Sequence, residues 1–436
     1  MLTKNLITTV IFFLASFPIQ NLAIPYNNEE TAIVPLLSSV NAQVIPDQYI
    51  VVLKDKLDKN TVDYHHNCVH SAITDEQQNI TKRGLSDEFV SGVRHVYYLD
   101  GFKGYSGRFS NEVLNIIRQS KEVAYVEKDQ VVYANELQRN APWGLARISH
   151  RSGLTFSSFN KYIYDESAGE GTTVYIIDTG INIYHVDFEG RAVWGVTVPD
   201  NDQDIDGNGT HVAGTVAGKR YGVSKKAKVV AIKVLRSNGS GTMSDVIKGV
   251  EYAVEFHLAE REKARKRGVP YKGAGANMSL GGGRSRTLDN VVDSAVDHGL
   301  IFAVAAGNDN GDACNASPAA SEKAITVAAS TIEDERAWFS NYGTCVDVFA
   351  PVNITSAWIG SRTATNTISG TSMASPHVAG LIAYFMGLEP DCQSEFYTQS
   401  LSPNKIKDDI IKLSTKNVLR KVPANTKNLL VFNNYS

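Results

Sequence analysis

The chain has 436 residues, of which 43% are hydrophobic and 20% are charged, as in an ordinary globular protein. These proportions exclude bulk disorder, a collagen-like repeat and a coiled coil. Lys and Arg total 43 against 46 Asp and Glu, so the net charge of −3 gives no reason to expect nucleic acid as a partner. The four cysteines are too few for a disulfide scaffold but sufficient for one structural bridge.

The first residues are typical of a secretory leader. Lys4 precedes an apolar run from Leu6 to Phe17, which suits the core of a signal peptide and is too short to span a bilayer. A membrane anchor is the alternative, but no later apolar run reaches the roughly 18 residues that a span needs. We therefore predict a signal peptide over residues 1–23, no membrane anchor and entry into the secretory pathway. Glycosylation triplets, Asn-x-Ser/Thr, occur at Asn79, Asn208, Asn238, Asn277, Asn315, Asn353 and Asn434.

Residues 45–133 have the pattern of a small α+β unit. The sequence predicts strands and helices in the order βαββαβ, a ferredoxin-like arrangement. The predicted elements are the strand Tyr49–Leu53, a helix within Asn60–Gln78, the strands Val93–Leu99 and Gly101–Phe109, the helix Asn111–Gln119 and the strand Val123–Glu127. A polar stretch, residues 134–140, follows this unit and marks its boundary.

The rest of the chain alternates apolar strands with helices and glycine-rich turns. This pattern predicts an α/β fold with a mostly parallel sheet and helices on both faces. The predicted strands are Thr173–Ile177, Val229–Leu235, Ala276–Leu280, Ile301–Ala305, Ile325–Ala329 and Val346–Phe349. Helices are predicted after a cap at Thr242 or Ser244, from Leu288 until Gly299, and from Ser372 to about Phe385.

Two polar residues lie at the carboxyl ends of predicted strands, where the active sites of such sheets are found, and a third lies at the start of a helix. Asp178 closes the strand V-Y-I-I-D, and Asn308 follows the strand end A-A-G. Ser372 lies at a helix start, where unpaired N–H groups favour the negative charge that develops in acyl transfer. Each residue taken alone is more simply interpreted as a turn or capping residue.

Four motifs in this order closely resemble the subtilisin family of serine endopeptidases. They are I-I-D-T-G-I at Ile176–Ile181, A-N-M-S-L-G-G at Ala276–Gly282, A-A-G-N at Ala305–Asn308 and G-T-S-M-A-S-P-H at Gly370–His377. The segments Ala141–Arg151 and Val234–Asp245 are similar to the proteinase K branch, in particular to the cerevisin-type vacuolar proteases of yeast. The resemblance implies a subtilisin-like peptidase domain over 141–433, an inhibitory propeptide over 45–133 and a processing linker over 134–140.

The resemblance also implies roles for particular residues. Ser372 would be the nucleophile, Asp178 the acid that orients a histidine, and Asn308 the side-chain donor of the oxyanion hole. The two walls of the substrate pocket would be Ser279, Leu280 and Gly281, and Ala305, Ala306 and Gly307. A strand edge for an extended substrate would come from Ser237, Asn238, Gly239, Ser240 and Gly241. The implied protein is a monomeric endopeptidase of peptides and proteins that needs no cofactor, is inhibited by its own propeptide and is vacuolar or extracellular.

The histidine of the triad is the exception. The family motif reads G-N-G-H-G-T-H and its first histidine is the base, whereas Asp206–His211 reads D-G-N-G-T-H and lacks the H-G pair. His211 therefore matches the second, non-catalytic histidine. If downstream packing anchors the helix, His211 lies three positions past the catalytic slot, about 4.5 Å along the axis and roughly 60° around it. If the upstream loop sets the register, Thr210 fills the slot and His211 is about 100° off.

Neither register makes His211 a good base, so we predict very weak activity or none. Two functions stay open. One is a working endopeptidase, through local rearrangement or because the pair is missing only from this copy of the sequence. The other is a catalytically dead relative that binds peptides or regulates. Of the other histidines, His185 and His377 match structural positions of the family, and His65, His66 and His70 lie in the propeptide.

The resemblance further implies a disulfide between Cys314 and Cys345, which leaves Cys68 and Cys392 unpaired; the alternative is that all four are free. It also implies a structural calcium ion near Asp347, with carbonyl groups around Pro318 and Ala320. The segment Asp202–Gly207 mimics the start of an EF-hand loop, but Ala213 stands at its twelfth position and excludes that site.

Overall fold

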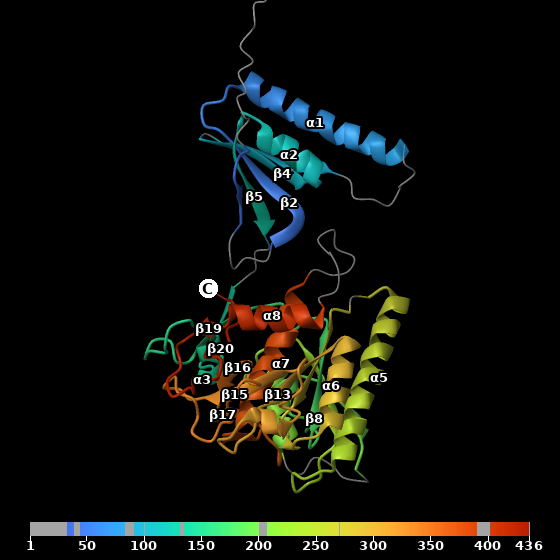
Figure 1. The fold of residues 1–436 in the computed structure, drawn as a ribbon, viewed down its shortest axis with the longest axis vertical. Coiled ribbons are helices and arrows are strands. Elements are labelled where there is room, and N and C mark those ends of the chain that lie inside the picture. Colours follow the sequence, from blue (N-terminus) through green and yellow to red (C-terminus); the bar gives the residue numbers. More distant parts are fainter. Residues whose placement is uncertain are drawn as a thin grey trace, which may run out of the picture. The chain divides into compact units, whose positions relative to one another are not determined.

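The computed structural model describes residues 33–38, 44–82, 91–99, 101–130, 135–199, 207–269, 271–389 and 402–435 (Figure 1). The chain divides into two compact units, Met1–Ser38 with Asp47–Asp129, and Ser39–Pro46 with Gln130–Ser436. The predicted signal peptide lies outside the described residues. No helix within the described ranges is long and apolar enough to cross a membrane.

The smaller unit is a five-stranded sheet with two helices. Its sheet has the order β1-β5-β2-β4-β3, and one buried cluster joins side chains of the sheet with those of both helices. The predicted α+β arrangement is confirmed, with the short strand β1 added. The elements are β1 (Leu36–Leu37), β2 (Val44–Leu53), α1 (Lys59–Lys82), β3 (Gly92–Leu99), β4 (Phe102–Arg108), α2 (Asn111–Gln119) and β5 (Val123–Gln130).

The larger unit is built on a nine-stranded sheet of order β19-β20-β16-β15-β13-β11-β8-β10-β9. All neighbouring strands pair in parallel except β19 and β20, so the predicted mostly parallel sheet is confirmed. The strands are β8 (Thr172–Asp178), β9 (Ala192–Thr197), β10 (Lys228–Lys233), β11 (Gly273–Met278), β13 (Leu300–Ala305), β15 (Ile325–Ser330), β16 (Val348–Pro351), β19 (Thr415–Lys416) and β20 (Leu429–Leu430).

Helices cover both faces of this sheet. Successive residues of a strand point to opposite faces, and Val174 and Ile176 of β8 join one buried cluster while Tyr175 and Ile177 join another. The first cluster includes α3 (Trp143–Ile148), α4 (Asn208–Ala217), α7 (Thr371–Leu388) and α8 (Pro403–Leu413); the second includes α5 (Met243–Arg267) and α6 (Arg286–Asp297). Both faces of β8 are therefore buried, which explains its uninterrupted apolar sequence.

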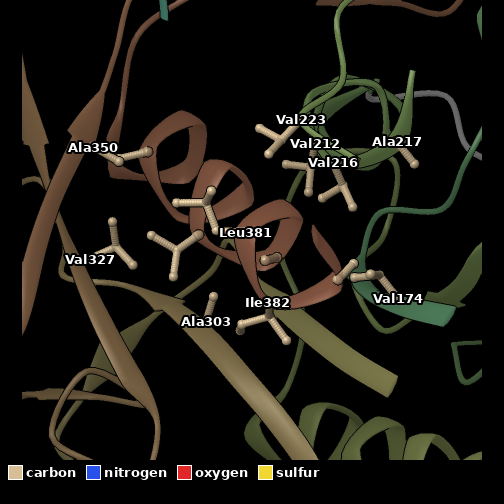
Figure 2. Packing of buried hydrophobic residues seen from close by; sticks show 14 of the residues in the cluster. Val174, Val212, Val216, Ala217, Val223, Ala303, Val327, Ala350, Leu381 and Ile382 are labelled. Atoms are coloured by element: carbon tan, nitrogen blue, oxygen red, sulfur yellow. The ribbon is translucent and has the colours of Figure 1, made fainter. Parts of the chain in front are cut away.

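Helix α7 lies at the centre of the first cluster. Figure 2 shows Leu381 and Ile382 of this helix among side chains of the sheet and of α4. Both side chains are fully buried, and burial of a Leu or Ile contributes roughly 1.5–3 kcal/mol. A Cβ atom on Gly380 would lie 2.6 Å from Cβ of Val223, so only glycine permits this close approach. The packing fixes α7, and with it the position of Ser372 at its amino end.

Short elements complete the larger unit. Residues 134–140 were expected to be a polar linker, but β6 (Asn135–Arg139) pairs antiparallel with β7 (Lys161–Asp165). The apolar pattern did not predict this strand, because none of residues 136–139 is buried. The remaining elements are η1 (Val186–Phe188), β12 (Gly282–Gly283), η2 (Ala313–Asn315), β14 (Ala316–Ser317), β17 (Ile354–Ala357) and β18 (Thr365–Ile368).

Candidate active site

Asp178 is the last residue of β8 and is fully buried. The N–H group of Thr179 donates to its Oδ1 at 2.7 Å. The Asp178 carbonyl accepts from the N–H groups of Val234 at 2.9 Å and Leu235 at 3.2 Å. These bonds hold the carboxylate at the edge of the sheet where the parallel strands end.

Ser372 is the second residue of α7. Its neighbours Thr371 and Met373 are buried, whereas Ser372 is half-buried. Its hydroxyl donates to the Ser279 carbonyl at 3.1 Å. Because Ile176 of β8 pairs with Asn277 of β11, Asp178 and Ser279 both lie two residues further along neighbouring strands. The structure thus brings the predicted acid and the predicted nucleophile to the same edge of the sheet.

Asn308 follows β13 and contacts the start of α7. Its Oδ1 accepts from both the N–H group of Thr371 at 2.8 Å and the Thr371 hydroxyl at 2.9 Å. The amide nitrogen Nδ2 therefore points away from Thr371. A Cβ atom built on Gly370 would lie 3.7 Å from Asn308 Nδ2 and 3.7 Å from the Ser372 backbone nitrogen. The Asn308 amide nitrogen and the Ser372 backbone nitrogen thus lie near the same point beside Gly370, and two N–H donors near one point are what an oxyanion requires.

Thr371 was not among the predicted site residues. It is buried, and its hydroxyl also accepts from the N–H group of Gly307 at 3.2 Å. Thr371 thus ties α7 to the loop that carries Asn308 and fixes the amide in one orientation. Its place directly before the serine in G-T-S is the signal that sequence reasoning could have used.

Three of the six residues predicted to form the pocket walls are buried, and one of these, Ser279, contacts the serine. Ser279 is 3% exposed, and its hydroxyl donates to the Ser372 carbonyl at 2.8 Å and lies 2.9 Å from the Ser375 hydroxyl. Ser279 therefore braces the serine turn instead of facing solvent. Ala305 and Ala306 are also buried, whereas Leu280 and Gly307 are half-buried and Gly281 is exposed.

The segment Ser237–Gly241 was expected to supply a strand edge, but it forms a turn. The N–H group of Arg236 donates to the Ser240 carbonyl at 2.8 Å, and that of Gly239 donates to the Arg236 carbonyl at 2.9 Å. Glycine at 239, with φ of 75°, suits this turn. The turn connects the carboxyl end of β10 to the cap of α5 and so stays at the same edge as Asp178.

Helix α4 places an asparagine beside the aspartate. Asn208 is the first residue of the helix, and its Nδ2 lies 3.5 Å from Asp178 Oδ2. The N–H group of Gly209 donates to the Thr179 hydroxyl at 3.0 Å. A Cβ atom on Gly209 would lie 2.0 Å from the Gly180 carbonyl oxygen, so glycine is required for this close approach. The first turn of α4 is thus fixed against the end of β8, with Asn208 facing the carboxylate.

His211 lies three residues further along α4 and is fully buried, which favours its match to the second, non-catalytic histidine over its doubtful assignment as the base. Its Nε2 donates to the Ile354 carbonyl at 2.9 Å, and its Nδ1 has no hydrogen-bond partner in the described part of the chain. Burial lowers the pKa of His211 to about 4, although the bond to Ile354 opposes that shift. The Ser356 hydroxyl donates to the His211 carbonyl at 2.8 Å, so contacts with β17 hold the register.

This result distinguishes between the two registers that the sequence left open. Contacts with β17 hold the helix, and the residue three positions before His211 lies beside Asp178. That residue is Asn208, which sequence reasoning did not name as a site residue. Counting back from His211 along G-T-H would have found it.

His185 and His377, the two further histidines that match positions of the family, occupy core positions. Nε2 of His185 donates to the Ala364 carbonyl at 2.8 Å, and Nδ1 of His377 donates to the Met373 carbonyl at 2.9 Å. Burial lowers the pKa of His377 to about 4. These two side chains have the structural roles that the sequence suggested, and His65 belongs to the core of the smaller unit.

Asp347 does not fit the expected calcium site. Its Oδ1 lies 3.0 Å from Nζ of Lys427, and its Oδ2 lies 3.1 Å from Nζ of Lys407. Lys407 also donates to the carbonyls of Glu322 at 2.9 Å and Ala324 at 2.6 Å. Two ammonium groups thus occupy the carboxylate that a cation would need. Among the described residues, no group of three His, Cys, Asp or Glu side chains could hold a metal ion, and the EF-hand-like segment 202–206 lies outside them.

The predicted disulfide between Cys314 and Cys345 is confirmed, with a Cα–Cα distance of 5.4 Å. It joins η2 to the loop before β16. Cys68 is free and exposed on α1, as predicted. Cys392 lies outside the described residues.

Comparison with known families decides the identity of the chain. Residues 169–429 match the subtilase family of peptidases, and residues 48–135 match the peptidase inhibitor I9 family. The chain belongs to the subtilase family. It is a subtilisin-like serine protease by family, preceded by an I9 inhibitor domain of the kind found in propeptides.

Fungal subtilases cover almost the whole chain. It is 54% identical to the subtilisin-like serine protease Pen c 2 of Penicillium citrinum, over 96% of this chain and 95% of that protein. It is also 54% identical to alkaline protease 2 of Aspergillus fumigatus, over 92% of this chain and 83% of that protein. Among solved structures, a cold-adapted subtilisin-like serine proteinase matches with a TM-score of 0.58 and 40% identity, over 67% of this chain and 98% of its own.

Proposed function

We propose that this subtilase has a serine endopeptidase site whose general base has been replaced by the amide of Asn208. Ser372 would be the nucleophile, with Asn308 and the Ser372 N–H group as oxyanion donors. Asp178 would be the acid of the triad. The observation that supports the proposal is the position of Asn208 Nδ2, 3.5 Å from Asp178 Oδ2, where the family motif places its histidine.

The chemical consequence follows from the protonation of an amide. A serine hydroxyl becomes nucleophilic when a neighbouring base removes its proton, and the amide of asparagine cannot accept a proton near neutral pH. Removal of the histidine from the triad of subtilisin costs about a millionfold in kcat. The oxyanion donors and substrate binding retain roughly a thousandfold to ten-thousandfold acceleration over water. We therefore propose that this protein cleaves peptide bonds very slowly.

Peptide binding does not depend on the base. The serine turn, the oxyanion donors and the turn Ser237–Gly241 are all held by hydrogen bonds that do not involve Asn208. This observation favours a second function, the binding of peptides without cleavage. The inhibitor domain of the same chain would then be one of the ligands. The leader over residues 1–23 supports a place in the secretory pathway, with the vacuole or the medium as destination.

Hydrolysis of a short peptide anilide by the secreted full-length chain and its variants tests the proposal. We expect Asn208→His to raise kcat/KM by at least about a thousandfold, since the helix register already aims this position at Asp178. The matched control Asn208→Gln keeps an amide and stays at the wild-type rate. Adding Ser372→Ala to Asn208→His removes the gain. Ordinary turnover by the wild type that His211→Ala abolishes is the result that overturns the proposal.

A further inference from the structure

The structure separates the seven glycosylation triplets by their surroundings. Asn277 is 0% exposed in the central strand β11, and Asn208 faces Asp178. Carbohydrate on either residue is incompatible with the folded larger unit. Asn434 is half-buried, and the exposed acceptors are Asn79 on α1 and three residues of the larger unit: Asn238, Asn315 and Asn353.

Asn238 differs from the other exposed acceptors in the way its amide is oriented. Its Oδ1 accepts from the N–H group of Ser240 at 3.0 Å and from the Ser240 hydroxyl at 2.7 Å. Ser240 is the hydroxyl residue of the same Asn-x-Ser triplet. Both bonds use the oxygen of the amide, so Nδ2, the atom to which a sugar is attached, points away from the turn. The folded turn therefore accommodates a substituent on Nδ2 without loss of either bond.

The position of this turn relative to the candidate active site follows from the backbone. Leu235 donates to the Asp178 carbonyl at 3.2 Å, and Asn238 is only three residues further along the chain. Three residues reach at most about 11 Å. Asn238 thus lies at the same edge of the sheet as Asp178, on the turn that the family resemblance assigns to substrate binding.

We propose that Asn238 carries an N-linked oligosaccharide at the rim of the candidate active site. This oligosaccharide hinders the access of folded proteins to the site more than that of short peptides. The co-reactant is an oligosaccharide linked to a lipid pyrophosphate. The bond from Nδ2 to sugar C1 forms, the bond from C1 to the pyrophosphate oxygen breaks, and the Nδ2 proton passes to a base of the transferase. The effect on access rests on the proposed function, whereas the modification itself does not.

The modification is tested by mass spectrometry of the full chain secreted from a yeast host. The protein is treated with peptide N-glycosidase in heavy-oxygen water and digested with trypsin, which releases Ser237–Lys248 with Asn238 as its only acceptor. We expect most of this peptide to carry heavy-isotope aspartate at 238. The buried Asn277 in the peptide Gly273–Arg284 serves as the internal control and stays asparagine. An unlabelled Ser237–Lys248 peptide in the wild type overturns the proposal.

Matched variants test whether the label depends on the Asn-x-Ser triplet. Ser240→Thr keeps a hydroxyl and is expected to keep the label, whereas Ser240→Ala and Asn238→Gln are expected to lose it. Secretion of the unlabelled variants at wild-type levels shows that the chain folds without the sugar. Label that persists in Ser240→Ala contradicts the assignment.

Access is measured in the Asn208→His background, where hydrolysis can be followed. We expect Asn238→Gln to raise the cleavage of a folded protein several-fold relative to that of a short peptide anilide. An unchanged ratio, with the sugar shown to be present in the parent, overturns the effect on access but not the modification. Absence of any hydrolysis in this background contradicts the proposed function, and the mass result still stands on its own.

Discussion

The two sides of the candidate active site differ in how completely they match a peptidase. On the serine side, Thr371 is hydrogen-bonded to Asn308 and Gly307, and the Ser372 hydroxyl donates to the Ser279 carbonyl, so the serine and the Asn308 amide are both held in place. On the aspartate side, Asp178 is equally well fixed, but its neighbour is the amide of Asn208. The difference teaches that the serine side of such a site can keep its hydrogen-bonded scaffold while the residue beside the aspartate differs from the family motif.

The reason is that different contacts hold the two features. The serine turn depends on bonds among α7, β11 and the loop after β13, none of which involves α4. The first turn of helix α4 is fixed by the N–H group of Gly209 and by the carbonyl of His211. Its first side chain can therefore change without disturbing either set of contacts.

The largest expected effect on the serine side is that of Asn308. In the Asn208→His background, Asn308→Ala removes one oxyanion donor, which should lower kcat by about 100- to 1,000-fold. KM should change little, because the donor acts on charge that develops in the transition state. Steady-state kinetics on a peptide anilide measure both quantities. A loss confined to KM contradicts the assignment of Asn308 as an oxyanion donor.

The aspartate side can be tested through the pH dependence of stability. His211 titrates near pH 6.5 in an unfolded chain, while burial lowers its pKa to about 4 in the folded chain. Between these values the unfolded chain binds the extra proton, so the free energy of unfolding decreases as the pH falls. The expected contribution of His211 is about 1.4 kcal/mol for each pH unit.

Denaturant unfolding of the wild type and of His211→Gln from pH 7 to pH 4 measures this contribution. The glutamine amide can still donate to the Ile354 carbonyl, so the variant should differ mainly by a shallower pH dependence. Part of the dependence will remain, since burial lowers the pKa of His257 and His377 to about 4 as well. Equal slopes for the two proteins contradict a buried, neutral His211.

A smaller effect is expected at Asp347, where two lysine ammonium groups lie in place of the calcium ion that the family resemblance implied. Lys407→Met removes one of two ammonium groups from a carboxylate that is 10% exposed, at a cost of about 2 kcal/mol. The matched control is Lys405→Met on the same helix, whose exposed pair with Asp409 contributes less than about 1 kcal/mol. Thermal unfolding measures both, and a chelator should leave the Tm of the wild type unchanged. A Tm that a chelator lowers and calcium restores contradicts this account of Asp347.

Most of the fold could be predicted because its signal is local. The continuous apolar strands, such as β8 and β15, are buried on both faces and were placed within about one residue of their observed bounds. Strand β11 begins three residues earlier than expected, since its first residues, Gly273-Ala274-Gly275, carry little apolar signal although they pair with β8. Helix α8 was not predicted, because only Ile406 and Ile410 of its residues are buried.

The candidate site was predictable where motif and backbone position coincide, as they do for Asp178, Asn308 and Ser372. The residue in the base position was not, because the sequence leaves two registers for α4. The register depends on contacts between residues far apart in the chain, such as that of the Ser356 hydroxyl with the His211 carbonyl. The lysines at Asp347 escaped prediction for the same reason, since Lys407 and Lys427 lie 60 and 80 residues beyond it.

The measurement that tests the central claim most directly is the intact mass of the secreted protein, produced in a host that lacks related proteases. Release of the inhibitor domain requires a single cleavage and no added substrate. We predict that Asn208→His loses the residues before the peptidase domain, whereas the wild type and the double variant Asn208→His, Ser372→Ala remain full length. A wild type that matures by itself, and that His211→Ala holds at full length, would show that His211 is the base and would contradict the account.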